Sequence, residues 1–184
     1  MLGLSSNLTN FGDWLSGTLA KRPDSYSAIA SYLQNALPDF QTIQRDRVSA
    51  EARGLDVIFK KDQDSIVVPF ERLSDGEKCY FVLAAALAAN EAYGPLLCIW
   101  DEPDNHLSLS EIGQFITSMR KTAKSGGQFI ATSHHPETVR KFSDDNTFVL
   151  TRKSHLDPTL SRLLRNCSYN GDLIDALIRD EVIG

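Results

Sequence analysis

Two adjacent carboxylic acids follow a short, strongly apolar segment in the middle of the chain. Residues 96–100 read Leu-Leu-Cys-Ile-Trp, and Asp101 and Glu102 come directly after them. A buried parallel strand delivers the residues after it to the carboxyl edge of its sheet, where ligands usually bind. An aspartate there can help to hold Mg²⁺, and a following glutamate can act as a general base toward an attacking water. The alternative is an ordinary acidic turn at the end of a strand.

A second candidate lies at the start of a long apolar segment. Ser74 is followed three residues later by Glu77, the pattern of a capping box. Gly76 removes side-chain bulk from the first turn, where backbone N–H groups and the helix dipole point outward and can accept a phosphate. Ser74 could therefore cap the helix, contact an anion, or do each in different states.

A third candidate is a pair of histidines after the next short apolar strand. A histidine at that edge, His134 or His135, can hydrogen-bond a γ-phosphate or a catalytic water. The alternative is a loop that begins a helix, with Pro136 at the first helical position. Zinc binding fits poorly, because no cysteine is near in sequence and His106 and His155 fit no ligand spacing. A Ser-His-Asp hydrolase has no G-x-S-x-G motif to support it.

The elements that must position these residues alternate between helix and strand. Apolar periodicity predicts helices at about residues 25–37 and 75–92, around 112–119, from 136 and around 173–178. Short apolar runs predict strands at residues 96–100, 128–132, 147–151 and 160–165, and a hairpin from 55–59 and 65–69. Residues 1–21 show no clear pattern, and could be a frayed end or part of a helix.

This alternation predicts an α/β fold with a mostly parallel sheet flanked by helices, preceded by a helix and a β-hairpin. We expect one domain over residues 1–184, with a helical lead-in at 1–50, the hairpin at 51–70 and the core that carries the candidate residues at 71–184. A chain of 184 residues that is 42% hydrophobic can bury one ordinary core.

Composition narrows the classes of protein. Neither a secretory signal nor an apolar run of membrane-spanning length is present, so we expect a cytoplasmic protein with no membrane partner. Cys79, Cys98 and Cys167 are far apart and odd in number, which indicates reduced thiols. The formal net charge of -5 argues against a broad nucleic-acid-binding surface on this stretch.

In this order, the segments around Ser74, Asp101 and His134 resemble the signature motif, the Walker B motif with its D-loop, and the switch histidine of ABC-type ATPases. The helix and hairpin before Ser74 are similar to the stretch that precedes the signature in SMC/RecF-like and OLD-like ATPases of bacteria and phage. Asp75, where transporters usually have Gly, looks like the SMC/OLD-type branch, so transport is the less favoured role.

The resemblance implies roles at a subunit interface for three residues. Ser74 and Gly76 would face the γ-phosphate of ATP bound by a partner subunit. Asp104 would lie in the D-loop at the dimer seam. The partner implied is a second ATPase head, in a homodimer.

It also implies roles in the chemistry. Asp101 would be the Walker B residue for Mg²⁺, Glu102 the catalytic base and His134 the switch histidine. Because His135 stands where the family often has a small polar residue, which histidine acts stays open.

The phosphate-binding P-loop, G-x-x-x-x-G-K-[ST], is missing from the sequence, which contains no Gly-Lys pair. Residues 12–18 have a threonine where the lysine belongs and no apolar strand ahead of them. We therefore expect the C-terminal lobe of a larger ATPase head whose P-loop lobe comes earlier, or a split or degenerate protein that needs a partner.

The function that the resemblance implies is ATP binding and hydrolysis, with ATP-driven dimerisation acting on DNA or an attached effector. The alternative is a non-catalytic ABC-like interaction module that docks on a partner subunit.

Overall fold

The computed structural model describes residues 10–47, 53–124, 126–142, 146–179 and 182. These residues fall into two compact units, the first within residues 1–100 and 117–130 and the second within 101–116 and 131–184. Among the described helices, none combines the length and apolar character needed to span a bilayer.

The first unit begins with two helices and a three-stranded sheet, continues through a long helix and ends on a second, smaller sheet. Its elements are α1 (Phe11–Lys21), α2 (Ser25–Ala36), β1 (Phe40–Arg47), β2 (Arg53–Lys61), β3 (Asp64–Pro69), the 3₁₀ turn η1 (Phe70–Arg72), α3 (Asp75–Tyr93), β4 (Leu97–Trp100) and β5 (Gln128–Ala131). Helix α4 (Leu109–Lys124) contributes residues to both units.

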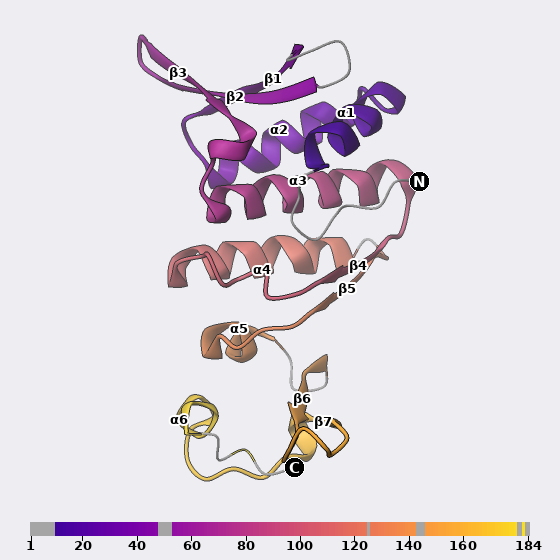
Figure 1. The fold of residues 1–184 in the computed structure, drawn as a ribbon, viewed down its shortest axis with the longest axis vertical. Coiled ribbons are helices and arrows are strands. Elements are labelled where there is room, and N and C mark those ends of the chain that lie inside the picture. Colours follow the sequence, from indigo (N-terminus) through magenta and orange to yellow (C-terminus); the bar gives the residue numbers. More distant parts are fainter. Residues whose placement is uncertain (1–9, 48–52, 125, 143–145, 180–181, 183–184) are drawn as a thin grey trace. The chain divides into compact units, whose positions relative to one another are not determined.

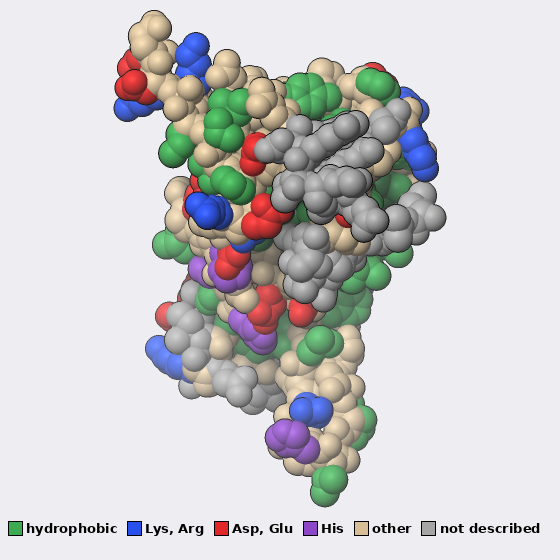
Figure 2. Space-filling view, turned by 45° about the horizontal axis from the view of Figure 1, so that its top comes forward, with side chains coloured by type: hydrophobic (Ala, Val, Ile, Leu, Met, Phe, Trp, Pro, Cys, Tyr) green, Lys and Arg blue, Asp and Glu red, His purple; other side chains and the backbone are tan. Residues whose placement is uncertain are grey.

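The three-stranded sheet contains the predicted hairpin. Strands β2 and β3 pair antiparallel from Lys61 opposite Asp64, which confirms the hairpin, and β1 pairs antiparallel with the other edge of β2. Alternate residues of β2 are buried, namely Leu55, Val57 and Phe59. Charged side chains of both signs gather at the hairpin tip (Figure 2).

Helix α3 is the most deeply buried helix of the first unit. Between Cys79 and Asn90 every residue except Ala86 is buried, so the helix is apolar on all sides. Helices α1 and α2 lie between the three-stranded sheet and α3 (Figure 1). Phe70 joins these layers, because its ring stacks on Phe11 at 4.7 Å and meets Phe81 edge-on at 5.7 Å.

The sheets differ from the prediction. Within the described residues they contain three, two and two strands, and the prediction of a mostly parallel sheet is wrong. Strands β4 and β5 form the small parallel sheet, joined through α4 as parallel neighbours require. Their apolar side chains are unusually exposed for parallel strands, at 58% for Leu97, 73% for Ile99 and 54% for Ile130.

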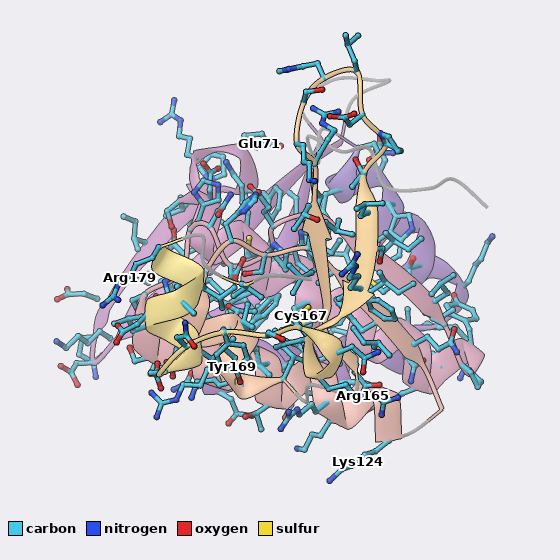
Figure 3. All side chains as sticks on the ribbon, turned by 90° about the horizontal axis from the view of Figure 1, so that it is seen from below. Glu71, Lys124, Arg165, Cys167, Tyr169 and Arg179 are labelled. Carbon is cyan, nitrogen blue, oxygen red and sulfur yellow. The ribbon has the colours of Figure 1, made fainter. Side chains whose placement is uncertain are left out.

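The second unit holds α5 (Pro136–Lys141), β6 (Phe148–Thr151), β7 (Leu160–Leu163), the 3₁₀ turn η3 (Leu164–Asn166) and α6 (Leu173–Ile178). Strands β6 and β7 pair antiparallel. Figure 3 labels Cys167 and Tyr169 in the segment between η3 and α6, and Arg179 directly after α6.

The helices agree closely with the expected positions, and two lead-in segments differ. Residues 11–21, for which the sequence shows no clear pattern, form α1, and Phe40–Arg47, placed in the helical lead-in, form β1. Residues 1–9 and 48–52 of the lead-in and hairpin ranges lie outside the described residues.

Candidate functional site

The loops that follow β4 and β5 meet through the hydroxyl of Thr132. This hydroxyl donates a hydrogen bond to Oδ1 of Asp101 and accepts one from the backbone N–H of Glu102 at 3.0 Å. The two adjacent acids are therefore tied to the loop that carries the histidines. Thr132 was not singled out from the sequence, and the only signal was its place at the end of an apolar strand, next to the histidine pair.

Glu102 is held on both carboxylate oxygens. Its Oε1 lies 2.8 Å from Nε2 of His134, and its Oε2 accepts a hydrogen bond from the side-chain amide of Asn105. The side chains of Glu102 and His134 are 32% and 87% exposed, so both can reach a ligand from solvent. Acidic and histidine side chains are exposed on the face shown in Figure 2.

The backbone of Glu102 adopts a left-handed conformation, with φ of +46°. This region costs a residue with a side chain about 1–2 kcal/mol relative to the right-handed one. Non-glycine residues in such conformations cluster at functional sites, where surrounding contacts hold them. At Glu102 those contacts are the hydrogen bonds to Thr132, His134 and Asn105.

His135 has a different environment from His134. It is the residue before α5, and its Nδ1 accepts a hydrogen bond from the backbone N–H of Glu137 at 3.3 Å. This is a helix cap, the alternative that the sequence offered for the pair. The geometry thus favours His134 as the histidine that meets the acidic pair.

Asp104 is buried, whereas Asp101 and His134 are exposed. Its side chain is 2% exposed, and its Oδ2 accepts hydrogen bonds from the hydroxyls of Ser133, at 2.6 Å, and Thr138. The predicted place of Asp104 at a dimer seam stays a prediction. Neither Ser133 nor Thr138 stood out in the sequence, because a single hydroxyl residue in a loop or a short helix carries no pattern.

Ser74 and Gly76 belong to the first unit, at the start of α3. The predicted capping box is confirmed: Ser74 Oγ accepts from the backbone N–H of Glu77 at 3.3 Å, and the Glu77 carboxylate accepts from the Ser74 N–H at 2.8 Å. Ser74 is exposed and Gly76 is half-buried, so the side chain of Ser74 is open to solvent. A contact with phosphate stays a prediction.

Asp101 and Thr132 in the second unit present oxygen atoms that a ligand could contact. No cluster of three or more His, Cys, Asp or Glu residues suited to a metal occurs in the part of the chain that the structure describes. The exposed Asp101 carboxylate with the Thr132 hydroxyl offers oxygen donors, and Mg²⁺ typically takes one or two carboxylates plus phosphates and waters. Residues 12–18 lie within α1, so they form no phosphate-binding loop.

Comparison with solved structures finds SMC ATPase heads. A structure described as "Structural biochemistry of ATP-driven dimerization and DNA stimulated activation of SMC ATPases" matches with a TM-score of 0.56 at 16% identity, over 82% of this chain and 90% of that one. An SMC head bound to the C-terminal winged-helix domain of ScpA matches with a TM-score of 0.58 at 19% identity, over 76% of this chain and 42% of that one. A head with an extended coiled coil from Pyrococcus furiosus matches with a TM-score of 0.57 at 19% identity, over 77% of this chain and 35% of that one.

These likenesses establish the fold. The chain spans less than half the length of two of the three matched heads. No curated protein matches the sequence.

A family model described as "AAA domain, putative AbiEii toxin, Type IV TA system" matches residues 15–140, which is more than half of the chain. The chain therefore belongs to this family of AAA domains, ATPases with an SMC-like fold.

Proposed function

We propose that the chain supplies the Walker B, D-loop, switch-histidine and signature parts of an ATP-hydrolysing, SMC/RecF-like ABC head. The observation that carries the proposal is the 2.8 Å contact between Glu102 and His134 beside Asp101. Membership of an AAA family implies nucleotide binding. A carboxylate paired with an exposed histidine, next to a second carboxylate, offers a general base and an Mg²⁺ ligand, two of the groups that ATP hydrolysis uses.

In the proposed mechanism Glu102 acts as the general base. Its carboxylate accepts a proton from the attacking water, and His134 holds that carboxylate in place and approaches the γ-phosphate. Asp101, with the hydroxyl of Thr132, would hold Mg²⁺, which neutralises charge on the phosphates. Asn105 keeps the second oxygen of Glu102 oriented, which leaves the first oxygen to His134 or water.

The phosphate grip would come from a P-loop lobe outside this sequence. Two observations support this part of the proposal. The sequence has no Gly-Lys pair, so it lacks the loop that cradles phosphates. Strands β4 and β5 expose Leu97, Ile99 and Ile130, although parallel strands normally bury both faces. A lobe that packs against the faces of this sheet would cover these side chains.

Ser74 and Gly76 would then complete the site of the opposite head in an ATP-closed homodimer, and Asp104 would lie in the D-loop near that seam. One of the matched SMC structures concerns ATP-driven dimerisation and DNA-stimulated activation of SMC ATPases. By analogy, ATP-driven dimerisation would act on DNA or on an attached effector. A non-catalytic docking module is the second candidate, and it is favoured by the missing P-loop motif alone.

Calorimetry with Mg·ATP tests whether ATP binding requires the proposed P-loop lobe. The 184-residue chain at high concentration should show no detectable binding, whereas the complete ATPase that contains a P-loop should bind and turn over ATP. Micromolar binding by the chain alone would mean that another segment replaces the P-loop. A complete protein that binds ATP without hydrolysing it would instead support the docking module.

A further inference from the structure

Asp104 is a buried carboxylate whose hydrogen bonds lead to one neighbouring segment. Its side chain is 2% exposed, and it lies in the loop after β4, close behind Asp101. Both hydroxyls that donate to it, those of Ser133 and Thr138, come from the segment around His134. The carboxylate therefore fastens the loop after β5 to the loop after β4.

Both donors converge on the same oxygen. Oδ2 accepts from Ser133 and Thr138, whereas Oδ1 is buried and has no hydrogen-bond partner among the described residues. A buried, partly satisfied carboxylate is costly to keep, since unmade hydrogen bonds of a buried charge are expensive. A surface loop that only needed to be folded could be fixed more simply by apolar packing.

Ser133 connects the Asp104 side chain to the backbone next to His134. Its Oγ, held by Asp104 at 2.6 Å, also accepts the backbone N–H of His135 at 2.9 Å. The two hydrogen bonds fix the backbone on either side of His134, whose own side chain is 87% exposed and contacts Glu102. The backbone around His134 is thus held through the side chain of Asp104, which is hydrogen-bonded to neither His134 nor Glu102.

We propose that Asp104 is a positioning residue. By binding the hydroxyls of Ser133 and Thr138, it sets the approach of His134 to Glu102. The role assigned to that pair rests on the proposed function, whereas the positioning itself is a property of this chain without nucleotide. The two ideas can therefore fail separately.

The test is a crossed pair of substitutions at Thr138, studied by NMR in the full 184-residue chain without ATP. Thr138→Val keeps the buried volume and removes the hydroxyl, whereas Thr138→Ser removes a methyl group and keeps the hydroxyl. We expect Thr138→Val to speed amide exchange at His135 about tenfold or more, the effect of losing a hydrogen bond to a charged group. The same change should move the His134 ring signals toward those of a Glu102→Ala variant.

Thr138→Ser should leave both readouts close to those of the wild type. A purely structural role predicts the opposite order, because Thr138 is buried and the serine leaves a cavity. The proposal is overturned if Thr138→Val leaves the His134 ring signals and His135 exchange unchanged, or if Thr138→Ser disturbs them as much as Thr138→Val does.

An exposed copy of the same motif in the second unit provides a matched control. Ser154 Oγ donates to Asp157 at 2.7 Å and accepts the N–H of Leu156 at 3.2 Å. Ser154→Ala should speed exchange at Leu156 only, and leave His134 and His135 unchanged.

If Thr138→Val fails to fold, Ser133→Ala decides the question, since Ser133 is only half-buried. A shift of the His134 ring signals in this variant supports the proposal. Unchanged signals overturn it. If the positioning is confirmed but the complete protein hydrolyses no ATP, the proposed function fails and the positioning role stands.

Discussion

His134 Nε2 lies 2.8 Å from Oε1 of Glu102, although the two residues follow different strands. Two hydrogen bonds connect the loops that carry them. The hydroxyl of Thr132 accepts the N–H of Glu102, and the hydroxyl of Ser133 donates to Asp104. The pair joins a candidate base to a residue that can bind phosphate.

His134 and His135 can be separated by substitution. In the complete ATPase, His134→Ala should lower kcat about a hundredfold while ATP binding is kept, because groups that assist proton transfer contribute about 10²–10⁴-fold. His135→Ala should cost some stability through its cap on α5 and leave kcat nearly unchanged. Steady-state kinetics with both variants checks this, and an equal loss in the two would show that His134 has no special role.

The left-handed backbone of Glu102 predicts an unusual order of stabilities. Because φ is +46°, Glu102→Gly should be more stable than Glu102→Ala by about 1 kcal/mol, since glycine has no side chain to strain. Arg120, exposed within α4, should show the reverse, with alanine favoured over glycine by about 1 kcal/mol. Urea unfolding of the four variants measures both differences. The same order at the two positions would contradict the assigned backbone conformation.

Ser74 can be tested for capping and for phosphate contact at once. Ser74→Ala should lose about 1 kcal/mol of stability, because it removes the cap of α3, whereas Ser74→Asp should keep the cap. Yet Ser74→Asp places a negative charge where the γ-phosphate of the partner head is expected, so ATP-dependent dimerisation should be lost. Thermal unfolding and light scattering with ATP separate the two effects. A dimer that tolerates the aspartate would leave Ser74 with its capping role alone.

Tyr32 offers a pH-dependent probe of the first unit. Burial and the hydrogen bond from its hydroxyl to Glu91, 3.0 Å long, raise the pKa of Tyr32 to about 12. The contribution of this contact to stability is fully present below pH 10, the ordinary tyrosine value, and is lost as the pH rises through about 12. Glu91→Gln should lower the pKa of Tyr32, which an absorbance titration measures. The Tyr32→Phe variant identifies which part of that titration belongs to Tyr32. An unchanged titration would place Tyr32 away from Glu91.

The sequence predicted most helices and the capping box, because apolar periodicity and local cap chemistry act within a few residues. Strand β1 was missed since its residues are mainly polar, including Gln41, Thr42 and Gln44, and only its pairing with β2 makes it a strand. The extent of parallel sheet was overestimated for a related reason. Short apolar runs identify strands, but which strands become neighbours depends on contacts distant in sequence.

The residues of the candidate site also fall into those that the sequence predicted and those that only the structure revealed. That Asp101, Glu102 and His134 would meet followed from their places after apolar strands, because such strands deliver their ends to one edge. The residues that hold them together could not be found this way. Thr132, Ser133 and Thr138 act through single hydroxyl groups, and their partners lie about thirty residues away along the chain.

Glu102→Gln in the complete protein tests most directly whether Glu102 is the base of an ATPase. Glutamine keeps the size of the side chain and removes its ability to accept a proton. Single-turnover hydrolysis should fall at least about a hundredfold, and an ATP-bound dimer should accumulate. Unchanged turnover in this variant would contradict the assignment of Glu102 and the account of the site built on it.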